Sequence, residues 1–343
     1  MKNIKDYNLE ELKKELQTIN EKPFRAEQIF KWLYQEKVKS FDEMTNLSLD
    51  LREKLKQNYT ICNYNILKKQ ESKDGTIKYL FDVLDGNAIE TVLMSYHHGY
   101  SICVSSQIGC KMGCKFCAST LGGLDRNLTP SEMLSQIYYI QRDTEERVSN
   151  VVMMGTGEPM DNYDNVLRFL ELITSEDGLN ISQRNITIST CGIVPKIKEL
   201  AQKHLQITLA ISLHSPNDEM RRGLMPIAMK YSIDELLDAC HYYFKETNRR
   251  MTFEYSLVAG VNDQPVHAEE LAGRLKGFPC HVNLIPVNPI KERDFKQSMP
   301  KSVMEFKKIL EKNRVNVTIR REMGADINAA CGQLRRKKLQ SRL

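Results

Sequence analysis

Residues 101–119, SICVSSQIGCKMGCKFCAS, join a strand-like run to a loop that carries three cysteines. Apolar and polar residues alternate in SICVSS, which is typical of a β-strand. Cys110, Cys114 and Cys117 then follow within eight positions. Gly109 and Gly113 allow the backbone of this loop to bend closely around a bound group. The stretch therefore predicts a strand whose carboxyl end leads directly into a ligand-binding loop.

Strand-like runs recur after this stretch, and helical stretches of more than ten residues lie between most of them. The runs are SICVSSQ, NVVMMG, NITIST, QITLAISL, MTFEYSLV, HVNLIPV and NVTIRR. A capping box with proline at the first helical position, formed by Thr129, Pro130 and Glu132, marks the start of one helix. Apolar strands that alternate with helices imply an α/β fold with a parallel sheet. The sheet could be doubly wound or a partial barrel, and in either form the site belongs at the carboxyl ends of the strands.

The chain before residue 100 is organised differently. Its first sixty residues place apolar side chains on one helix face, at Ala26, Ile29, Phe30 and Leu33. Three strand-like runs follow, ICNYNILKKQ, TIKYLFDVL and AIETVLM, and Asp-Gly turns separate them. We therefore expect a small helical domain at residues 1–60, a β meander at 61–98 and a catalytic domain at 99–343.

Composition and charge limit the class of protein. The start MKNIKDYNLEELKKELQ lacks the apolar core of a signal peptide, and the chain has no run of about 18 apolar residues, so we expect a cytoplasmic protein with no membrane span. Thiols stay reduced there, so the nine cysteines indicate metal or redox chemistry rather than a disulfide scaffold. The net charge is +5, and the end RRKKLQSRL is strongly basic. Such a tail can bind a nucleic-acid backbone, and the alternative is a solvated tail that aids solubility.

The three clustered cysteines favour an iron–sulfur cluster. A closed zinc site needs four ligands, and the nearest further cysteine, Cys103, falls within the predicted strand. A 4Fe–4S cluster normally binds one thiolate at each iron, so three cysteines leave one iron open to a substrate or cofactor. Phe116 would shield the cluster from water. A zinc site or a purely structural site is the alternative.

A second motif, VVMMGTGEP at residues 151–159, is a buried strand that runs into a glycine loop. Gly155 and Gly157 leave room for close approach to the backbone, and Glu158 offers a carboxylate to an ammonium group. On its own this pattern is weak, because a tight turn with a solvated glutamate has the same sequence.

The spacing C-x₃-C-x₂-C, with an aromatic residue before the last cysteine, resembles the radical S-adenosylmethionine (SAM) superfamily. The resemblance implies a partial (β/α)₆ barrel and one 4Fe–4S cluster held by Cys110, Cys114 and Cys117. It also implies that SAM binds the open iron, and that Gly157 and Glu158 form the loop that binds the methionine amino group.

Longer motifs are similar to those of the RlmN/Cfr family, in the same order and over residues 5–336. They are CVSSQIGCKMGCKFCASTLGGLDRNL, GTGEP, ISTCGIVP, SLHSPND, LVAGVND, VNLIPVNP and DINAACGQL. Pro159 and the IPVNP stretch resemble the members that methylate adenine C2. The resemblance implies methylation of C2 of adenine 2503 in 23S rRNA and of adenine 37 in tRNAs. The alternative within the family is C8 methylation of the same rRNA adenine.

Family resemblance also assigns catalytic roles. Cys331 would take a methyl group from one SAM, and a second SAM would supply the radical that activates this methyl group, so that each methylation uses two SAM. Cys103 would close a transient disulfide with Cys331, and Glu90 would accept the C2 proton. Alternation in AIETVLM places Glu90 opposite Ile89 and Thr91, so a solvated surface glutamate is the alternative.

The remaining site residues also come from the resemblance. Further SAM contacts fall on Ser189, Ser212, Leu213, His214 and Asn288. Four cysteines match no functional position and are interpreted as packing residues: Cys62, Cys191, Cys240 and Cys280.

The expected partners are 23S rRNA and tRNA, held in part by the helical domain and the basic tail. An electron donor such as flavodoxin or ferredoxin would reduce the cluster, and we expect a monomer. Two alternatives differ in class: a non-catalytic RNA-binding protein with a structural metal site, and a radical enzyme that modifies a peptide. The second does not explain AACGQL and the basic tail together.

Overall fold

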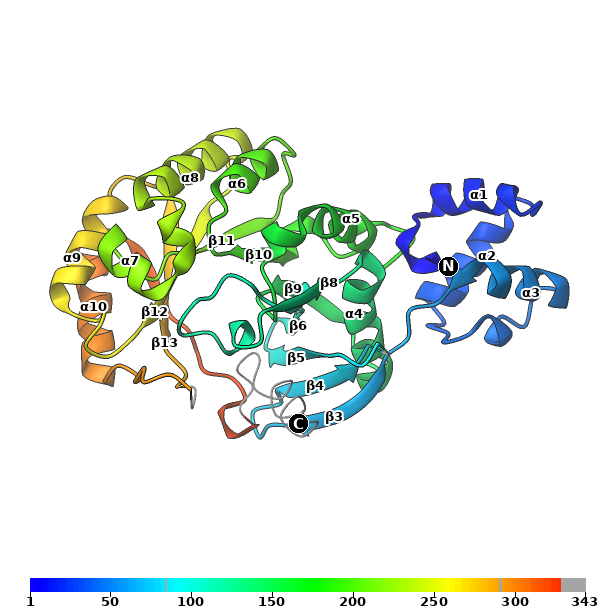
Figure 1. The fold of residues 1–343 in the computed structure, drawn as a ribbon, viewed down its shortest axis with the longest axis horizontal. Helices are drawn as coiled ribbons and strands as arrows, with labels where there is room; N and C mark the ends of the chain where they lie inside the picture. Colours follow the sequence, from blue (N-terminus) through cyan, green and yellow to red (C-terminus); the bar gives the residue numbers. More distant parts are fainter. Residues whose placement is uncertain (84, 290–291, 328–343) are drawn as a thin grey trace.

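The computed structural model describes residues 1–83, 85–289 and 292–327, and within these ranges ten strands form one sheet (Figure 1). Seven of them run parallel: β6 (Gly99–Cys103), β9 (Val148–Met153), β10 (Ile186–Thr190), β11 (Thr208–Ser212), β12 (Met251–Leu257), β13 (Cys280–Pro286) and β14 (Asn316–Ile319). They are hydrogen-bonded in chain order. Each lies within or overlaps one of the seven strand-like runs, so the predicted parallel sheet is confirmed.

Helices cover the outer side of this curved sheet (Figure 1). They are α4 (Pro130–Thr144), α5 (Tyr163–Thr174), α6 (Val194–Ala201), α7 (Asp218–Leu224), α8 (Ile233–Thr247), α9 (Pro265–Arg274) and α10 (Pro300–Lys312), with short 3-10 turns η4 (Pro159–Asn162), η5 (Gln183–Asn185) and η6 (Pro226–Met229). The predicted capping box starts α4, where the Thr129 hydroxyl accepts from the Glu132 amide and the Glu132 carboxylate accepts from the Thr129 amide. Alternating parallel strands and covering helices make an α/β partial barrel.

The predicted meander is also present, as β3 (Asn65–Glu71), β4 (Ile77–Asp82) and β5 (Ala88–Tyr96). Gly75 and Gly86 supply the positive φ angles of its turns, +83° and +88°. The meander is not a separate sheet, because β5 pairs with β6 in antiparallel register. It therefore extends the barrel wall and carries its side chains to the edge of the site.

The first sixty residues form a helical unit beside the barrel (Figure 1). It contains α1 (Leu9–Thr18), α2 (Arg25–Tyr34) and α3 (Leu49–Asn58), the 3-10 turns η1 (Ile4–Asp6) and η2 (Phe41–Glu43), and a pairing of β1 (Lys2–Asn3) with β2 (Tyr59–Thr60). The apolar face predicted on α2 is buried. The unit docks on α4 and α5, where the Ser131 amide donates to the Asp6 carboxylate at 2.8 Å and Arg168 pairs with Glu11.

In the part of the chain that the structure describes, every helix is too short or too polar to cross a membrane.

After β14 the chain returns to the turn between β3 and β4 and is held there by two aspartates. The Gly324 amide donates to Asp74 at 2.8 Å, and the Lys73 amide and Ser72 hydroxyl donate to Asp326, at the 3-10 turn η7 (Ala325–Ile327). The hydrogen bond from Ser72 lowers the pKa of Asp326, and the bond from Gly324 lowers the pKa of Asp74. These contacts fix the segment that leads to Cys331, which itself lies outside the described residues.

We expect these contacts to weaken in acid. Because the pKa is lowered in the folded state, the stabilisation from the contact is fully present above the ordinary carboxyl pKa of about 4. It is lost as the pH falls from there through the lower folded-state pKa. The protection factor of the Gly324 amide in hydrogen exchange should therefore decrease in the wild type as the pH is lowered below about 4. Asp74→Ala should lower it at neutral pH, because the acceptor is gone. Asp177→Ala, which removes an exposed carboxylate after α5, is the control, and equal protection in both variants would contradict the assignment.

Candidate functional site

The three-cysteine loop forms one wall of a cavity of about 220 Å³ at the carboxyl ends of the barrel strands. A two-stranded ribbon closes the base of the loop, formed by β7 (Gln107–Gly109) and β8 (Leu124–Asn127). The Thr120 hydroxyl, in the 3-10 turn η3 (Ala118–Thr120), lies 3.1 Å from the Cys114 carbonyl and 3.0 Å from that of Cys117. Cys110 and Cys114 are buried and Cys117 is partly exposed. The local backbone thus presents all three thiols to one cavity.

The carboxyl ends of β9 to β12, with the loops that follow β9, β10 and β11, form the opposite walls. Of the predicted SAM contacts, five line this cavity: Gly157, Glu158, Ser189, Ser212 and His214. Leu213 does not, because its side chain is in the hydrophobic core while its amide donates to the Glu254 carbonyl. Asn288 lines a neighbouring cavity.

The glycine loop packs directly against the backbone that follows β6. A Cβ added to Gly155 would lie 2.6 Å from the Val104 carbonyl oxygen, and one added to Gly157 would lie 2.7 Å from the Gln107 amide nitrogen. Gly157 also has a φ of +115°, which residues with a side chain rarely adopt. Glycine is therefore required at both positions, and this close approach places Glu158 at the cavity.

Glu158 is 4% exposed, so the alternative of a solvated glutamate is wrong. One carboxylate oxygen accepts from the Cys191 amide at 2.7 Å, and the other accepts from the Met160 amide at 3.0 Å. Burial raises the pKa of Glu158, while these hydrogen bonds lower it. An anchored carboxylate of this kind can bind an ammonium group that enters the cavity.

His214 is a neutral hydrogen-bonding group in the same wall. Its Nδ1 accepts from the Ser256 amide at 2.9 Å, which leaves the proton of the neutral ring on Nε2. Its ring meets Phe116 edge to face, with centroids 4.7 Å apart. Burial lowers the pKa of His214 to about 3, and the charge of Arg221 contributes. The histidine therefore contributes a donor but no charge at neutral pH.

The residues around the three thiols fit a 4Fe–4S cluster. Cys114 packs in a small apolar cluster with Leu224 and Met225, against which Phe116 and Cys117 lie. Burial raises the pKa of Cys110 to about 12 and raises that of Cys114 further, so a metal would have to displace these thiol protons. In the described ranges, no three His, Cys, Asp or Glu side chains converge on a single metal ion. A cluster binds each thiolate at a different iron, so it requires thiols around a shared cavity, as seen here.

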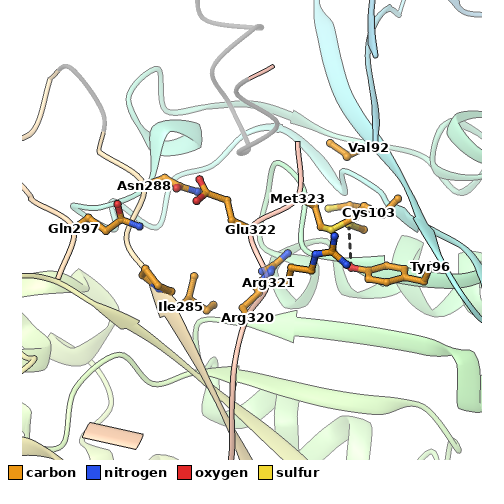
Figure 2. A pocket seen from close by; sticks show the side chains of 12 residues that line it. Val92, Tyr96, Cys103, Ile285, Asn288, Gln297, Arg320, Arg321, Glu322 and Met323 are labelled. Carbon is orange, nitrogen blue, oxygen red and sulfur yellow. Dashed lines mark hydrogen bonds between the residues drawn. The ribbon is translucent and has the colours of Figure 1, made fainter. Parts of the chain in front are cut away.

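A second cavity, of about 190 Å³, lies beside the first and shares Ile285 and Arg320 with it. Figure 2 shows Cys103 beside Met323 on one side of this cavity, with Asn288 and Gln297 on the other. Cys103 is 6% exposed and ends strand β6. Cys103 is thus close in sequence to the three-cysteine loop, but it lines the second cavity, whereas the loop lines the first.

Glu90 faces this second cavity's side of the sheet. It lies two residues before Val92, which lines the cavity and pairs with Cys103 across β5 and β6. Its carboxylate is 2.8 Å from the Lys78 ammonium, and the two side chains are 3% and 0% exposed. The alternative of a solvated Glu90 is wrong, because β5 is covered on both faces; on the other face Thr91 bonds to Gln136 of α4.

Cys240 and Cys280 pack in the core as predicted, and Cys62 is partly buried against it. Two other residues, Cys191 and Glu254, line the first cavity although the sequence did not indicate this. Cys191 also donates its amide to Glu158, so its interpretation as a packing residue alone is corrected. Glu254 lies on β12.

Glu254 accepts from the Asn283 side-chain amide at 3.0 Å. Burial raises the pKa of Glu254, and the charge of Arg320 lowers it. A carboxylate within the apolar run MTFEYSLV was the available signal, since an acidic residue is seldom buried without a reason.

Comparisons with known proteins agree with this geometry. A family model described as "Ribosomal RNA large subunit methyltransferase N-terminal domain" matches residues 2–61, and the radical SAM superfamily model matches residues 104–272. A protein of Lachnoclostridium phytofermentans named "Probable dual-specificity RNA methyltransferase RlmN" is 63% identical, over 97% of this chain and 94% of its own. A protein of the same name from Lachnospira eligens is 61% identical, over 98% and 97%. The crystal structure of a radical SAM methyltransferase from Sphaerobacter thermophilus matches with a TM-score of 0.93 and 42% identity, covering 97% of this chain and 99% of that one.

We expect Gly157→Ala to disrupt the first cavity. The added Cβ meets backbone that cannot move easily, and the positive φ adds strain of about 1–3 kcal/mol. The variant should have a lower Tm and should lose measurable SAM binding in calorimetry of the reconstituted protein. Gly273→Ala is the matched control: it lies in α9 with no atom near the added Cβ, and alanine suits a helix better by about 0.5–1 kcal/mol. Unchanged SAM binding in Gly157→Ala would contradict the role of this loop.

Proposed function

The chain belongs to the RlmN family of the radical SAM superfamily, and from this membership we propose that it is an RNA methyltransferase acting on C2 of adenine. The proposed substrates are adenine 2503 of 23S rRNA and adenine 37 of tRNAs. One observation on this structure supports the proposal independently of family membership. The cavity lined by the three thiols and the cavity lined by Cys103 are neighbours, and both are lined by Ile285 and Arg320. Radical formation and methyl transfer can therefore occur in neighbouring spaces.

The superfamily implies a 4Fe–4S cluster and SAM. When bound, the two together supply a 5′-deoxyadenosyl radical. Cys110, Cys114 and Cys117 would hold the cluster, and Glu158 would bind the amino group of SAM. Other proposed SAM contacts are Gly157, Ser189, Ser212, Leu213, His214 and Asn288. Leu213 can contribute only through its backbone, since its side chain is in the core.

We propose that Cys331 receives a methyl group from one SAM and that a second SAM is used to activate it, so that two are consumed in each methylation. Transfer of one hydrogen atom from this methyl group to the 5′-deoxyadenosyl radical would leave a methylene radical on the Cys331 sulfur, and its carbon would add to C2 of the adenine. The adduct would then lose its C2 proton to Glu90 and one electron to a one-electron acceptor, a role that the cluster held by Cys110, Cys114 and Cys117 would supply.

Cys103 completes the reaction. Its thiolate forms an S–S bond with the Cys331 sulfur while the carbon–sulfur bond breaks. The electron pair of that bond stays with the carbon, which takes up a proton and becomes the methyl group. Burial of Cys103 beside Val92 and Met94 supports this role, because it keeps competing thiols away from the sulfur. The disulfide is afterwards reduced to two thiols.

We propose the same division of the chain that the sequence predicts: a helical RNA-binding unit at residues 1–60, a meander at 61–98 and a catalytic domain at 99–343. Continuity of the sheet joins the last two. We also propose that the protein acts in the cytoplasm as a monomer, and that flavodoxin or ferredoxin supplies its electrons. The basic end RRKKLQSRL suits an RNA partner.

Nucleoside mass spectrometry tests the activity. The anaerobically reconstituted protein, a reductant and methyl-labelled SAM are incubated with 23S rRNA or tRNA that lacks the modification. We expect labelled 2-methyladenosine at the two proposed positions. Labelled 8-methyladenosine alone would show that the position is wrong, and no labelled adenosine despite SAM cleavage would contradict an RNA substrate.

Two cysteine variants test the proposed chemistry. Cys103→Ala should accumulate protein covalently linked to RNA, because the carbon–sulfur bond can no longer be broken by disulfide formation. Cys331→Ala should still cleave SAM but should form no methylated adenosine. Cys240→Ala, a change in the buried core away from both cavities, is the control for the loss of a cysteine. Turnover by Cys103→Ala with no RNA-linked protein on a denaturing gel would rule out its assigned role.

A further inference from the structure

Lys78 is a fully buried lysine beside the proposed proton acceptor. Its side chain is 0% exposed, and its ammonium lies 2.8 Å from Oε2 of Glu90. Removing an ammonium group from water costs several kcal/mol even after the protein relaxes. Strand pairing between β4 and β5 needs no such pair, since well-packed apolar residues serve as well. The pair therefore calls for an explanation beyond the stability of the sheet.

The sheet register places this pair on the side of the reaction. Lys78 of β4 lies directly opposite Val92 of β5, and Val92 lies opposite Cys103 of β6. Side chains that are directly opposite project from the same face of a sheet. Glu90 is two residues before Val92 and shares that face. Lys78, Glu90 and Cys103 thus project from the face that lines the second cavity.

Glu90 is a charged neighbour of Lys78 on this face. Leu80 lies opposite Glu90, and Gln70 of β3 lies opposite Lys78. The Gln70 Oε1 and the Thr76 hydroxyl are buried and have no hydrogen-bond partner among the described residues. Both flank Lys78, Gln70 across the strand and Thr76 two residues before it. Lys78 is therefore flanked by one polar side chain just before its own strand, by another on β3, and by Val92 on β5.

We propose that Lys78 is a positioning residue that holds Glu90 as an oriented carboxylate, ready to accept the C2 proton. A buried carboxyl group without a cation beside it is favoured in its neutral form, which cannot accept a proton. The ammonium of Lys78 lies against Oε2 of Glu90 and fixes the orientation of this carboxylate. In the step itself the C2–H bond breaks, the proton goes to Glu90, and the electron pair stays in the adenine ring. This inference rests on the proposed function.

The test compares Lys78→Met with Lys78→Arg in the full-length reconstituted protein, under single-turnover conditions and with RNA deuterated at C2 of the target adenine. In Lys78→Met we expect SAM cleavage to continue, the RNA-linked protein to accumulate, and 2-methyladenosine to form at least about tenfold more slowly. Its deuterium isotope effect should exceed that of the wild type, because proton removal becomes rate-limiting. Lys78→Arg keeps the cation and should restore most of the rate.

A purely structural role would not move the isotope effect. Lys69→Met is the matched control: it removes a lysine from the neighbouring strand β3 that pairs with Glu71 and Asp143 and is 33% exposed. It should resolve the adduct like the wild type. Lys78→Met with a wild-type isotope effect and no accumulated adduct would overturn the proposal.

A second comparison covers the case in which Lys78→Met does not fold. The double variant Lys78→Met/Glu90→Gln buries no unpaired charge, so it should fold. If Lys78 acts through Glu90, the double variant and Glu90→Gln resolve the adduct at the same rate. A further slowing in the double variant would refute that path. Should the wild type yield 8-methyladenosine, the C2 assignment fails separately, and deuterium at C8 tests Lys78 in the same way.

Discussion

The pairing of strand β6 is the constraint on which both cavities depend. It is hydrogen-bonded in parallel to β9 and in antiparallel register to β5, so it joins the barrel to the meander. Cys103 ends the strand, and the chain after it passes under the glycine loop, where the Gly155 amide donates to the Val104 carbonyl. The same few residues then lead to the three-cysteine loop. Because this backbone is in contact with both loops, displacement of β6 would disturb both cavities together.

Three buried charged groups of this molecule make specific hydrogen bonds or ion pairs with neighbouring residues. Arg221 is 0% exposed, and its guanidinium donates to the Cys191 carbonyl at 2.8 Å and to the Leu213 carbonyl at 3.2 Å. It thereby ties the ends of β10 and β11 together at the wall of the first cavity. Glu158 is held by two amides and Lys78 by Glu90. Each group would be costly to bury alone, so each is restricted to one geometry, which is what a reaction site requires.

The strands and the three-cysteine loop could be predicted from the sequence because their signals are local. Alternation marks a strand and cysteine spacing marks a metal loop, wherever the segment lies in the fold. The environment of Glu90 could not be predicted, because alternation indicates two faces but not that α4 covers one and the pair with Lys78 closes the other. Cys191 was missed for a similar reason: its amide reaches Glu158, 33 residues away, only once β9 and β10 are paired.

Ile285 and Arg320 line both cavities and form the wall between them. Ile285 lies near the carboxyl end of β13 and has an apolar side chain, and Arg320 begins the segment after β14, with its amide bonded to the Leu284 carbonyl. Both residues are therefore positioned by the β13–β14 pairing rather than by a mobile loop. An apolar residue limits the entry of water, while a guanidinium beside the buried Glu254 offers a charge to anionic groups. In the reaction proposed above, this wall would lie between the cluster and the RNA and would leave the two sides in contact, so that a methyl group carried on a cysteine would be activated on one side and transferred on the other.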